Sequence, residues 1–173
     1  MGQGQLAVLA AECANRGMDI DTTISAGNQL IRRRRSLALL HVLRYAVRGG
    51  RVPSWVKTVA DLLRLKPVIA TKPDGAISLA GFLFAGRDRV DRFARFIARR
   101  APNDQAIRVA IGHAICETDA KMLESSIRSK IPAIKELSID GLGPALGAHG
   151  GPDTLLVTVS PIVSLDDIAG GAD

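Results

Sequence analysis

One short turn constrains the fold of this chain more than any other feature of its sequence. Residues Lys72-Pro73-Asp74-Gly75 separate two β-prone runs, 67–71 and 76–82. Proline fixes the backbone at the start of a turn, and Asp-Gly favours the conformation that closes it. Two such runs joined by so short a connection predict an antiparallel hairpin. The fold must therefore contain a sheet that is at least partly antiparallel, which excludes an all-helical bundle.

Hydrophobic periodicity predicts the other elements. Helices are expected at residues 6–16, 20–31, 55–63, 88–100 and 117–130, the first ending at Gly17 and the second capped by Asp19 or Asp21. Further strands are expected at residues 37–42, 107–111, 135–140 and 154–159. We therefore expect an α/β (α+β) fold with a mixed, largely antiparallel sheet of about six strands packed with helices.

Composition limits the class of protein. The chain has 173 residues, of which 47% are hydrophobic and only 3% aromatic, so one aliphatic core is expected. No apolar run approaches the roughly 20 residues needed to span a bilayer, and no signal peptide is recognisable, so a cytoplasmic location is expected. Cys13 and Cys116 lack CxxC spacing or nearby histidines, so we expect reduced core residues and no metal site.

Arginine is concentrated in two clusters, and the net charge is +6. One cluster is Arg32 to Arg35, and the other comprises six arginines between Arg87 and Arg100. Such clusters attract nucleic acid or acidic partners, but they also occur as solvated faces. No nucleic-acid module or aromatic stacking cluster accompanies them, so nucleic-acid binding is not favoured. The cluster Arg32 to Arg35 also follows the helix predicted at residues 20–31, where positive side chains interact favourably with the negative end of the helix dipole.

Two positions could recognise an anion. His149 lies among Gly147, Gly150 and Gly151, and glycines can bring backbone N–H groups close to a ligand. A flexible turn with an exposed histidine explains the same pattern. Arg51 follows Gly49-Gly50, a tight turn that could present its guanidinium to a carboxylate or phosphate. His41 and His113 are expected to be satisfied structural histidines, and no catalytic motif is present, so no enzyme is predicted.

Taken in order, several motifs resemble the C-terminal part of the DegV family of fatty-acid-binding proteins. They are Gly2-Gln3-Gly4 before an Ala-rich helix, Arg48-Gly49-Gly50-Arg51-Val52, Leu65-Lys66-Pro67-Val68-Ile69 before Asp74-Gly75, Ile111-Gly112-His113-Ala114, and the glycine-rich stretch from Gly143 to Pro152. The resemblance covers nearly the whole chain to Val159. It implies that a long-chain fatty acid, and no cofactor, is the ligand, with Arg51, His149, Gly150 and Gly151 toward its carboxylate.

The resemblance also implies a domain organisation. The family's N-terminal domain would be absent, residues 1–35 would be a helical pair left over from it, residues 36–159 would form the C-terminal domain, and residues 160–173 would be a flexible tail. Possible partners are then the missing domain and a fatty acid kinase, to which intact relatives present the lipid. The alternative, from the arginine clusters, is a basic interaction domain that docks an acidic protein or nucleic acid.

Overall fold

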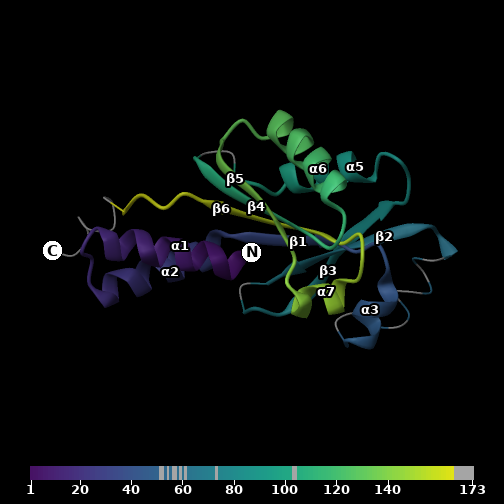
Figure 1. Ribbon diagram of the computed structural model, residues 1–173, viewed down its shortest axis with the longest axis horizontal. Helices are drawn as coiled ribbons and strands as arrows, with labels where there is room; N and C mark the ends of the chain where they lie inside the picture. The colour runs from purple at the N-terminus through teal and green to yellow at the C-terminus, as the bar shows by residue number, and fades with distance from the viewer. Residues whose placement is uncertain are drawn as a thin grey trace.

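The strands form one six-stranded mixed sheet with the order β3-β2-β1-β6-β4-β5 (Figure 1). The computed structural model describes residues 1–50, 53, 55, 58, 60, 62–72, 74–102 and 105–165. Its strands are β1 (Arg35–Leu39), β2 (Leu65–Thr71), β3 (Ile77–Phe84), β4 (Ile107–His113), β5 (Ile134–Gly141) and β6 (Leu155–Pro161). The predicted α/β class is confirmed.

Strand pairing follows the sequence prediction. β2 and β3 form the expected antiparallel hairpin, in which Thr71 pairs with Ile77. β1 pairs antiparallel with β2 and with β6, and β6 pairs antiparallel with β4. Only β4 and β5 are parallel, and α6 (Glu117–Lys130) connects them, because parallel neighbours need a long crossover. The sheet is therefore largely antiparallel, as predicted.

Two helices cover one face of the sheet. α5 (Arg89–Ala98) and α6 lie side by side above it in Figure 1. Phe93, Ile97, Leu123 and Ile127 are fully buried at 0% exposure, which confirms the predicted inward faces of both helices. β4 was expected to be half-buried, but almost all of its residues are buried. It pairs on both sides and lies in the main core, so neither face reaches solvent.

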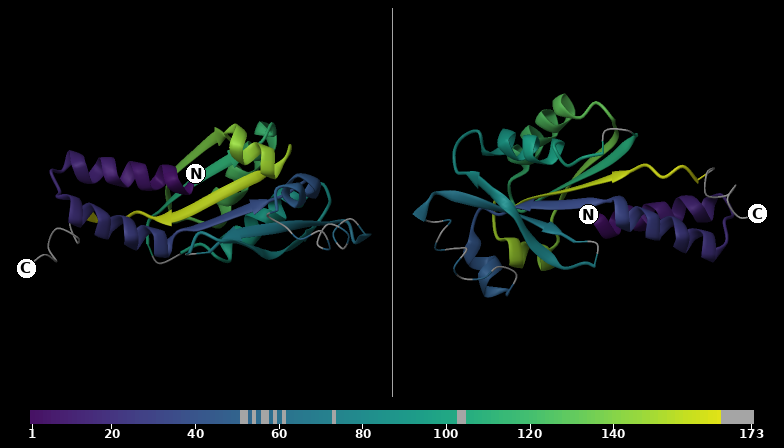
Figure 2. Two further views of the ribbon diagram at one scale, coloured as in Figure 1. Left: turned by 90° about the horizontal axis from the view of Figure 1, so that it is seen from below. Right: turned by 180° about the vertical axis from the view of Figure 1, so that it is seen from behind.

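A helical pair stands at one end of the sheet. α1 (Gly2–Asn15) and α2 (Ile20–Arg33) extend beyond the strands, with the start of α1 nearest to the sheet (Figure 2). Gly17 has the positive φ of 71° expected at the end of α1, and Asp19 caps α2 by accepting a bond from Thr22 N–H at 2.7 Å. The pair has a small core of its own, to which Leu165 contributes.

Two short helices were not predicted. α3 (Leu43–Arg48) follows β1, which ends at Leu39 rather than at Val42. α7 (Pro144–Gly150) occupies the glycine-rich stretch that was expected to be a loop. Pro144 is at a first-turn position, where its missing N–H costs nothing, and Ala145, Leu146 and Ala148 favour the helix. His149 is thus on a helix.

The structure describes part of the helix predicted at residues 55–63 and part of the tail predicted at residues 160–173. Trp55, Thr58, Ala60 and Leu62 of the predicted helix at residues 55–63 are helical, Leu63 lies in a turn, and the other positions lie outside the described residues. Trp55 is 60% and Leu62 80% exposed, so these two side chains of the expected apolar face are not buried. In the expected tail, Ser160 and Pro161 belong to β6, and positions beyond Leu165 lie outside the described residues.

Both cysteines, and the two histidines other than His149, have surroundings typical of structural residues. Cys13 and Cys116 are free and buried, as predicted. His41 and His113 differ from expectation, because the Nδ1 atom of each is buried without a hydrogen-bond partner among the described residues. Burial, and to a lesser degree Lys66, lowers the pKa of His41, so its imidazole is held in the neutral form near neutral pH.

Candidate functional site

The face of the sheet opposite α5 and α6 carries an apolar groove. Its floor follows from the alternation of β1, which turns Leu37 and Leu39 into the main core and Ala38 and Leu40 toward the other face. Leu156 on β6 joins Ala38 and Leu40 in the second, smaller core cluster. The short helices α3 and α7 lie on this side of the sheet in Figure 1, and Leu43 and Ala46 of α3 belong to the same cluster.

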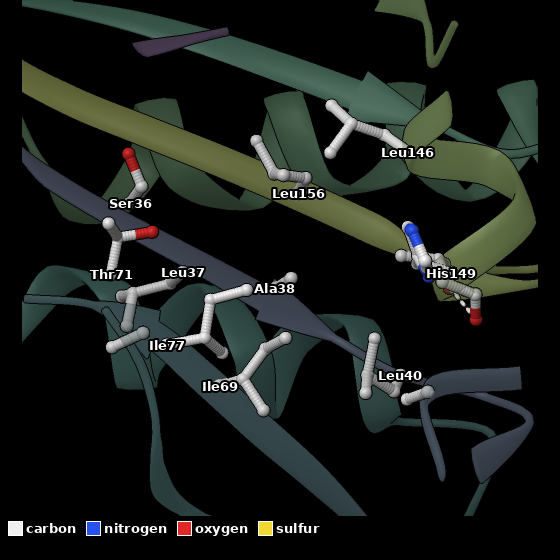
Figure 3. A pocket seen from close by; sticks show the side chains of 14 residues that line it. Ser36, Leu37, Ala38, Leu40, Ile69, Thr71, Ile77, Leu146, His149 and Leu156 are labelled. Carbon is white, nitrogen blue, oxygen red and sulfur yellow. Dashed lines mark hydrogen bonds between the residues drawn. The ribbon is translucent and has the colours of Figure 1, made fainter. Parts of the chain in front are cut away.

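Aliphatic side chains form most of the groove, whose volume is about 200 Å³. The lining residues are Ser36, Leu37, Ala38, Leu40, Ala46, Ile69, Ala70, Thr71, Ile77, Leu146, His149, Gly150, Thr154 and Leu156. Figure 3 shows His149 at one end of this row and Ser36 and Thr71 at the other, with Ile69 and Leu156 between them. Such a groove suits an elongated apolar ligand with a polar group at an end.

Helix α7 places His149 against the Gly49-Gly50 turn. A Cβ built on Gly49 would overlap with the His149 imidazole ring, so only glycine allows this close approach. α3 and α7 are neighbours in the fold, which brings together the two sequence motifs singled out above. The expected pairing of His149 with Arg51 cannot be followed further, because Arg51 lies outside the described residues.

The two glycines after His149 are both buried but differ in their surroundings. Gly150 lines the groove, and its carbonyl accepts a bond from Thr154 Oγ1 at 2.8 Å. Gly151 does not line the groove, and its N–H donates to the Gly147 carbonyl at 2.8 Å, ending α7. Gly151 packs its backbone on the ring of Tyr45 from α3. Glycine at position 151 therefore allows α3 and α7 to pack against each other.

Replacing Gly151 with alanine should destabilise this junction. Gly151 has a φ of 76°, and a Cβ there would overlap with the Tyr45 ring. A side chain at positive φ costs roughly 1–3 kcal/mol, to which the displacement of the ring adds. We expect Gly151→Ala to lower the free energy of unfolding by about 2 kcal/mol or more in urea denaturation. Gly147→Ala is the matched control: its Cβ meets nothing within 4 Å, so equal destabilisation by both variants would contradict this explanation.

Side chains with catalytic potential near the groove are engaged structurally. Ser36 Oγ lies 2.9 Å from Thr158 Oγ1, and Thr154 donates to a backbone carbonyl. Burial raises the pKa of Cys116 to about 11, so its thiol stays protonated near neutral pH. Among the described residues, no group of His, Cys, Asp and Glu could hold a metal ion, and no helix is long and apolar enough to cross a membrane.

The arginines of α5 are largely paired. Arg89 forms an ion pair with Asp119, Arg92 with Asp88 at 2.6 Å, and Arg95 with Asp91 at 3.1 Å. Arg100 stacks over the Phe96 ring at 3.6 Å. These contacts neutralise much of the positive charge that the sequence suggested for an acidic partner, so this cluster behaves mainly as a solvated helix face.

Sequence reasoning found His149 but missed the apolar wall. Ala38, Ile69 and Leu156 belong to three strands that are adjacent in the sheet order β2-β1-β6. The alternation within each strand could have identified which side chains share a face. It could not have shown that a groove stays open on this face beside the short helices α3 and α7.

Comparison with known proteins gives the same architecture. The family model described as "Uncharacterised protein, DegV family" matches residues 1–161. A DegV domain-containing protein from Clostridium perfringens is 28% identical over 156 residues, covering 90% of this chain and 55% of the relative. The chain thus spans about half the length of the curated relatives it matches.

Two solved structures extend the comparison. A fatty-acid-binding DegV protein from Streptococcus agalactiae has a TM-score of 0.80 at 23% identity, covering 93% of this chain and 56% of its own. A DegV protein from Thermus thermophilus, also described as binding fatty acid, has a TM-score of 0.81 at 22% identity, covering 93% and 57%. At such identities the structures establish the fold, while the family model spans most of the sequence. This chain belongs to the DegV family.

Proposed function

We propose that this chain binds a long-chain fatty acid, with the acyl chain in the apolar groove and the carboxylate toward His149. The observation that carries the proposal is the row of aliphatic side chains on the open face of the sheet, ending at an imidazole. Burial of each methylene contributes about 0.8 kcal/mol, so a long chain gains most of its affinity from such a wall. The fatty-acid binding of the Streptococcus and Thermus relatives supports this choice of ligand.

The groove supplies one wall of the site, and a further domain supplies the other. Support comes from the length of the relatives, nearly twice the matched region, and from the apolar groove on this side of the sheet. Val8, Ile20 and Ile24 on the helical pair are 45%, 70% and 54% exposed. These apolar side chains suit a second packing surface for that domain. Residues 1–35 then belong with the further domain, and residues 36–159, together with the end of β6 at Pro161, form the lipid-binding domain.

The head group is held by the residues around the α3–α7 contact. His149, Gly150 and Gly151 lie there, and Arg51 follows the Gly49-Gly50 turn that His149 touches. The chain acts as a carrier rather than a catalyst, and a fatty acid kinase is the partner that the resemblance to the family implies.

Removing the imidazole should weaken head-group binding. A hydrogen bond to a charged carboxylate contributes roughly 1.5–3 kcal/mol, so His149→Ala should lower the affinity for palmitate about tenfold to a hundredfold. The measurement is titration calorimetry on the chain combined with the N-terminal domain of the Streptococcus agalactiae relative. Palmitate methyl ester is the matched control ligand, because it lacks the charge. Equal palmitate affinity in wild type and His149→Ala would remove His149 from the site.

Ionic strength separates this proposal from the alternative of a basic interaction domain. Binding that depends on phosphate or carboxylate pairing by many arginines falls steeply with salt, whereas acyl-chain burial does not. We expect palmitate affinity to change less than tenfold between about 50 and 200 mM salt. Tight binding of an acidic polymer such as heparin, lost over the same salt range and unaffected by palmitate, would instead favour the interaction domain.

A further inference from the structure

A second cavity, lined mainly by cationic and hydroxyl side chains, adjoins the end of the groove opposite His149. Its volume is about 270 Å³, and its described lining residues are Ile31, Arg34, Arg35, Ser36, Thr71 and Lys72. Ser36 and Thr71 also line the apolar groove, so the two spaces are neighbours. Figure 3 shows these two residues at the far end of the row from His149. No carboxylate is among the lining residues.

The arginines at the end of α2 differ from one another in their hydrogen-bond partners. Arg33 donates to Gln105 Oε1 at 2.6 Å, and Arg35 Nη1 donates to the carbonyls of Arg32 and Arg34 at 3.0 Å each. These two residues explain why arginines suit this helix terminus, where carbonyl groups lack partners. Arg34 differs, because its Nη1 is buried and has no hydrogen-bond partner among the described residues.

The surroundings of the Arg34 guanidinium are positive. A Cβ on Gly2 would lie 3.1 Å from Arg34 Nη1 and 3.3 Å from Ser36 Oγ, so the guanidinium sits between the first turn of α1 and strand β1. That turn carries the positive end of the α1 dipole and contains no acidic residue. No described carboxylate forms an ion pair with Arg34. The charge of this guanidinium is therefore unbalanced, and an anion held in the cavity that Arg34 lines would balance it.

The hydroxyls can complete such a site. Ser36 Oγ and Thr158 Oγ1 are 2.9 Å apart, and either can be the donor. If Thr158 donates, the Ser36 hydroxyl hydrogen is free to point into the cavity. Lys72 adds a second cation from the hairpin turn. The guanidinium of Arg34, the ammonium of Lys72 and the hydroxyls are all hydrogen-bond donors. Donors of these three kinds together bind a carboxylate or a phosphate.

We propose that Arg34, Lys72, Ser36 and Thr71 form an anion-binding subsite, so that the groove accepts a long-chain dicarboxylic acid with one carboxylate at each end. The four residue steps from Ser36 in β1 to Leu40 just after it correspond to about 13 Å, a distance that an acyl chain can bridge. The proposal rests on the proposed function for the placement of the acyl chain and of the first carboxylate. The subsite itself depends only on the residues around Arg34.

The experiment compares hexadecanedioate with palmitate by titration calorimetry on the chain combined with the N-terminal domain of the Streptococcus agalactiae relative, below the aggregation threshold of either lipid. A charge-assisted contact at the second end should make the diacid bind about tenfold or more tightly than palmitate. Arg34→Met keeps the apolar stem and removes the guanidinium, so it should abolish this preference. Arg32→Met is the matched control, because it removes the same charge from the same helix end at an exposed position. This variant should keep the preference for the diacid. Arg34→Lys should restore part of the preference.

A second titration tests the subsite without any acyl chain. Inorganic phosphate should shift the amide resonances of Ser36, Thr71 and Lys72 in wild type and not in Arg34→Met. If palmitate fails to bind even with the N-terminal domain added, while phosphate binds in this way, the proposed function fails and the subsite stands. Phosphate binding without any preference for the diacid would show a free-anion site and overturn the link to the groove. The absence of any response that depends on Arg34 would overturn the subsite as a whole.

Discussion

Palmitate should bind to the chain alone weakly or not at all, and addition of an N-terminal DegV domain should raise the affinity by two to four orders of magnitude. The physical reason is the open side of the groove, which leaves part of the acyl chain in water. Loss of cover over four methylenes costs about 3 kcal/mol, or more than a hundredfold in affinity. Titration calorimetry with and without the N-terminal domain of the Streptococcus agalactiae relative measures the difference.

The control for this prediction is a chain whose groove is blocked at an exposed position. Leu146 lines the groove and is 48% exposed, so Leu146→Asp should leave the fold intact while placing a charge on the wall. The added domain should then restore much less affinity. Tight stoichiometric binding by the chain alone would show that the second wall is dispensable.

Truncation of Phe93 should give the largest loss of stability. Phe93 belongs to α5, and its side chain is 0% exposed in the main core. Phe→Ala at such a site typically costs about 3–5 kcal/mol, through lost burial and the cavity left behind. For a chain of 173 residues this corresponds to a decrease in Tm of roughly 6–20 °C. Thermal unfolding followed by circular dichroism provides the measurement.

Phe84 provides the matched comparison. It is 63% exposed at the end of β3, and Arg92 lies over its ring at 5.8 Å. Phe84→Ala should therefore change the free energy of unfolding by less than about 1 kcal/mol. If the two variants unfolded at the same temperature, the main core would not lie where the structure places it.

Elements with a strong local signal were predictable from the sequence. The hairpin follows from the turn at Asp74-Gly75, and α6 from a helical period through Ala120, Leu123 and Ile127, all three fully buried. In each case the hydrophobic pattern and the local turn or capping chemistry point to the same structure. The largely antiparallel sheet followed from these segments, since parallel pairs need long connections.

The short helices α3 and α7 were not predictable in the same way. α7 has only seven residues, of which two are glycines and one is a proline, so its composition resembled a loop. Short helices depend on tertiary packing rather than on propensity. Here that packing is the contact between Gly151 and Tyr45, which joins residues distant in the sequence. The position of His149 against Gly49 depends on the same contact.

The candidate site was predictable only at its polar end. Glycines around His149 identified a position where the backbone approaches another group closely, which the contact with Gly49 illustrates. The apolar wall depends on which face of the sheet remains uncovered, a property of the whole fold. Likewise, the arginine run gave no sign that Arg34 alone would turn inward, because its neighbours have the same side chain.

The most direct test of the central claim is to locate the acyl chain by NMR. Uniformly ¹³C-labelled palmitate is bound to the methyl-labelled chain in the presence of the added N-terminal domain, and intermolecular nuclear Overhauser effects are recorded. The account predicts contacts from the acyl chain to the methyl groups of Leu40, Ile69 and Leu156, which line the groove. Contacts confined to Ile20 and Ile24 on the helical pair, with none to the groove, would contradict it.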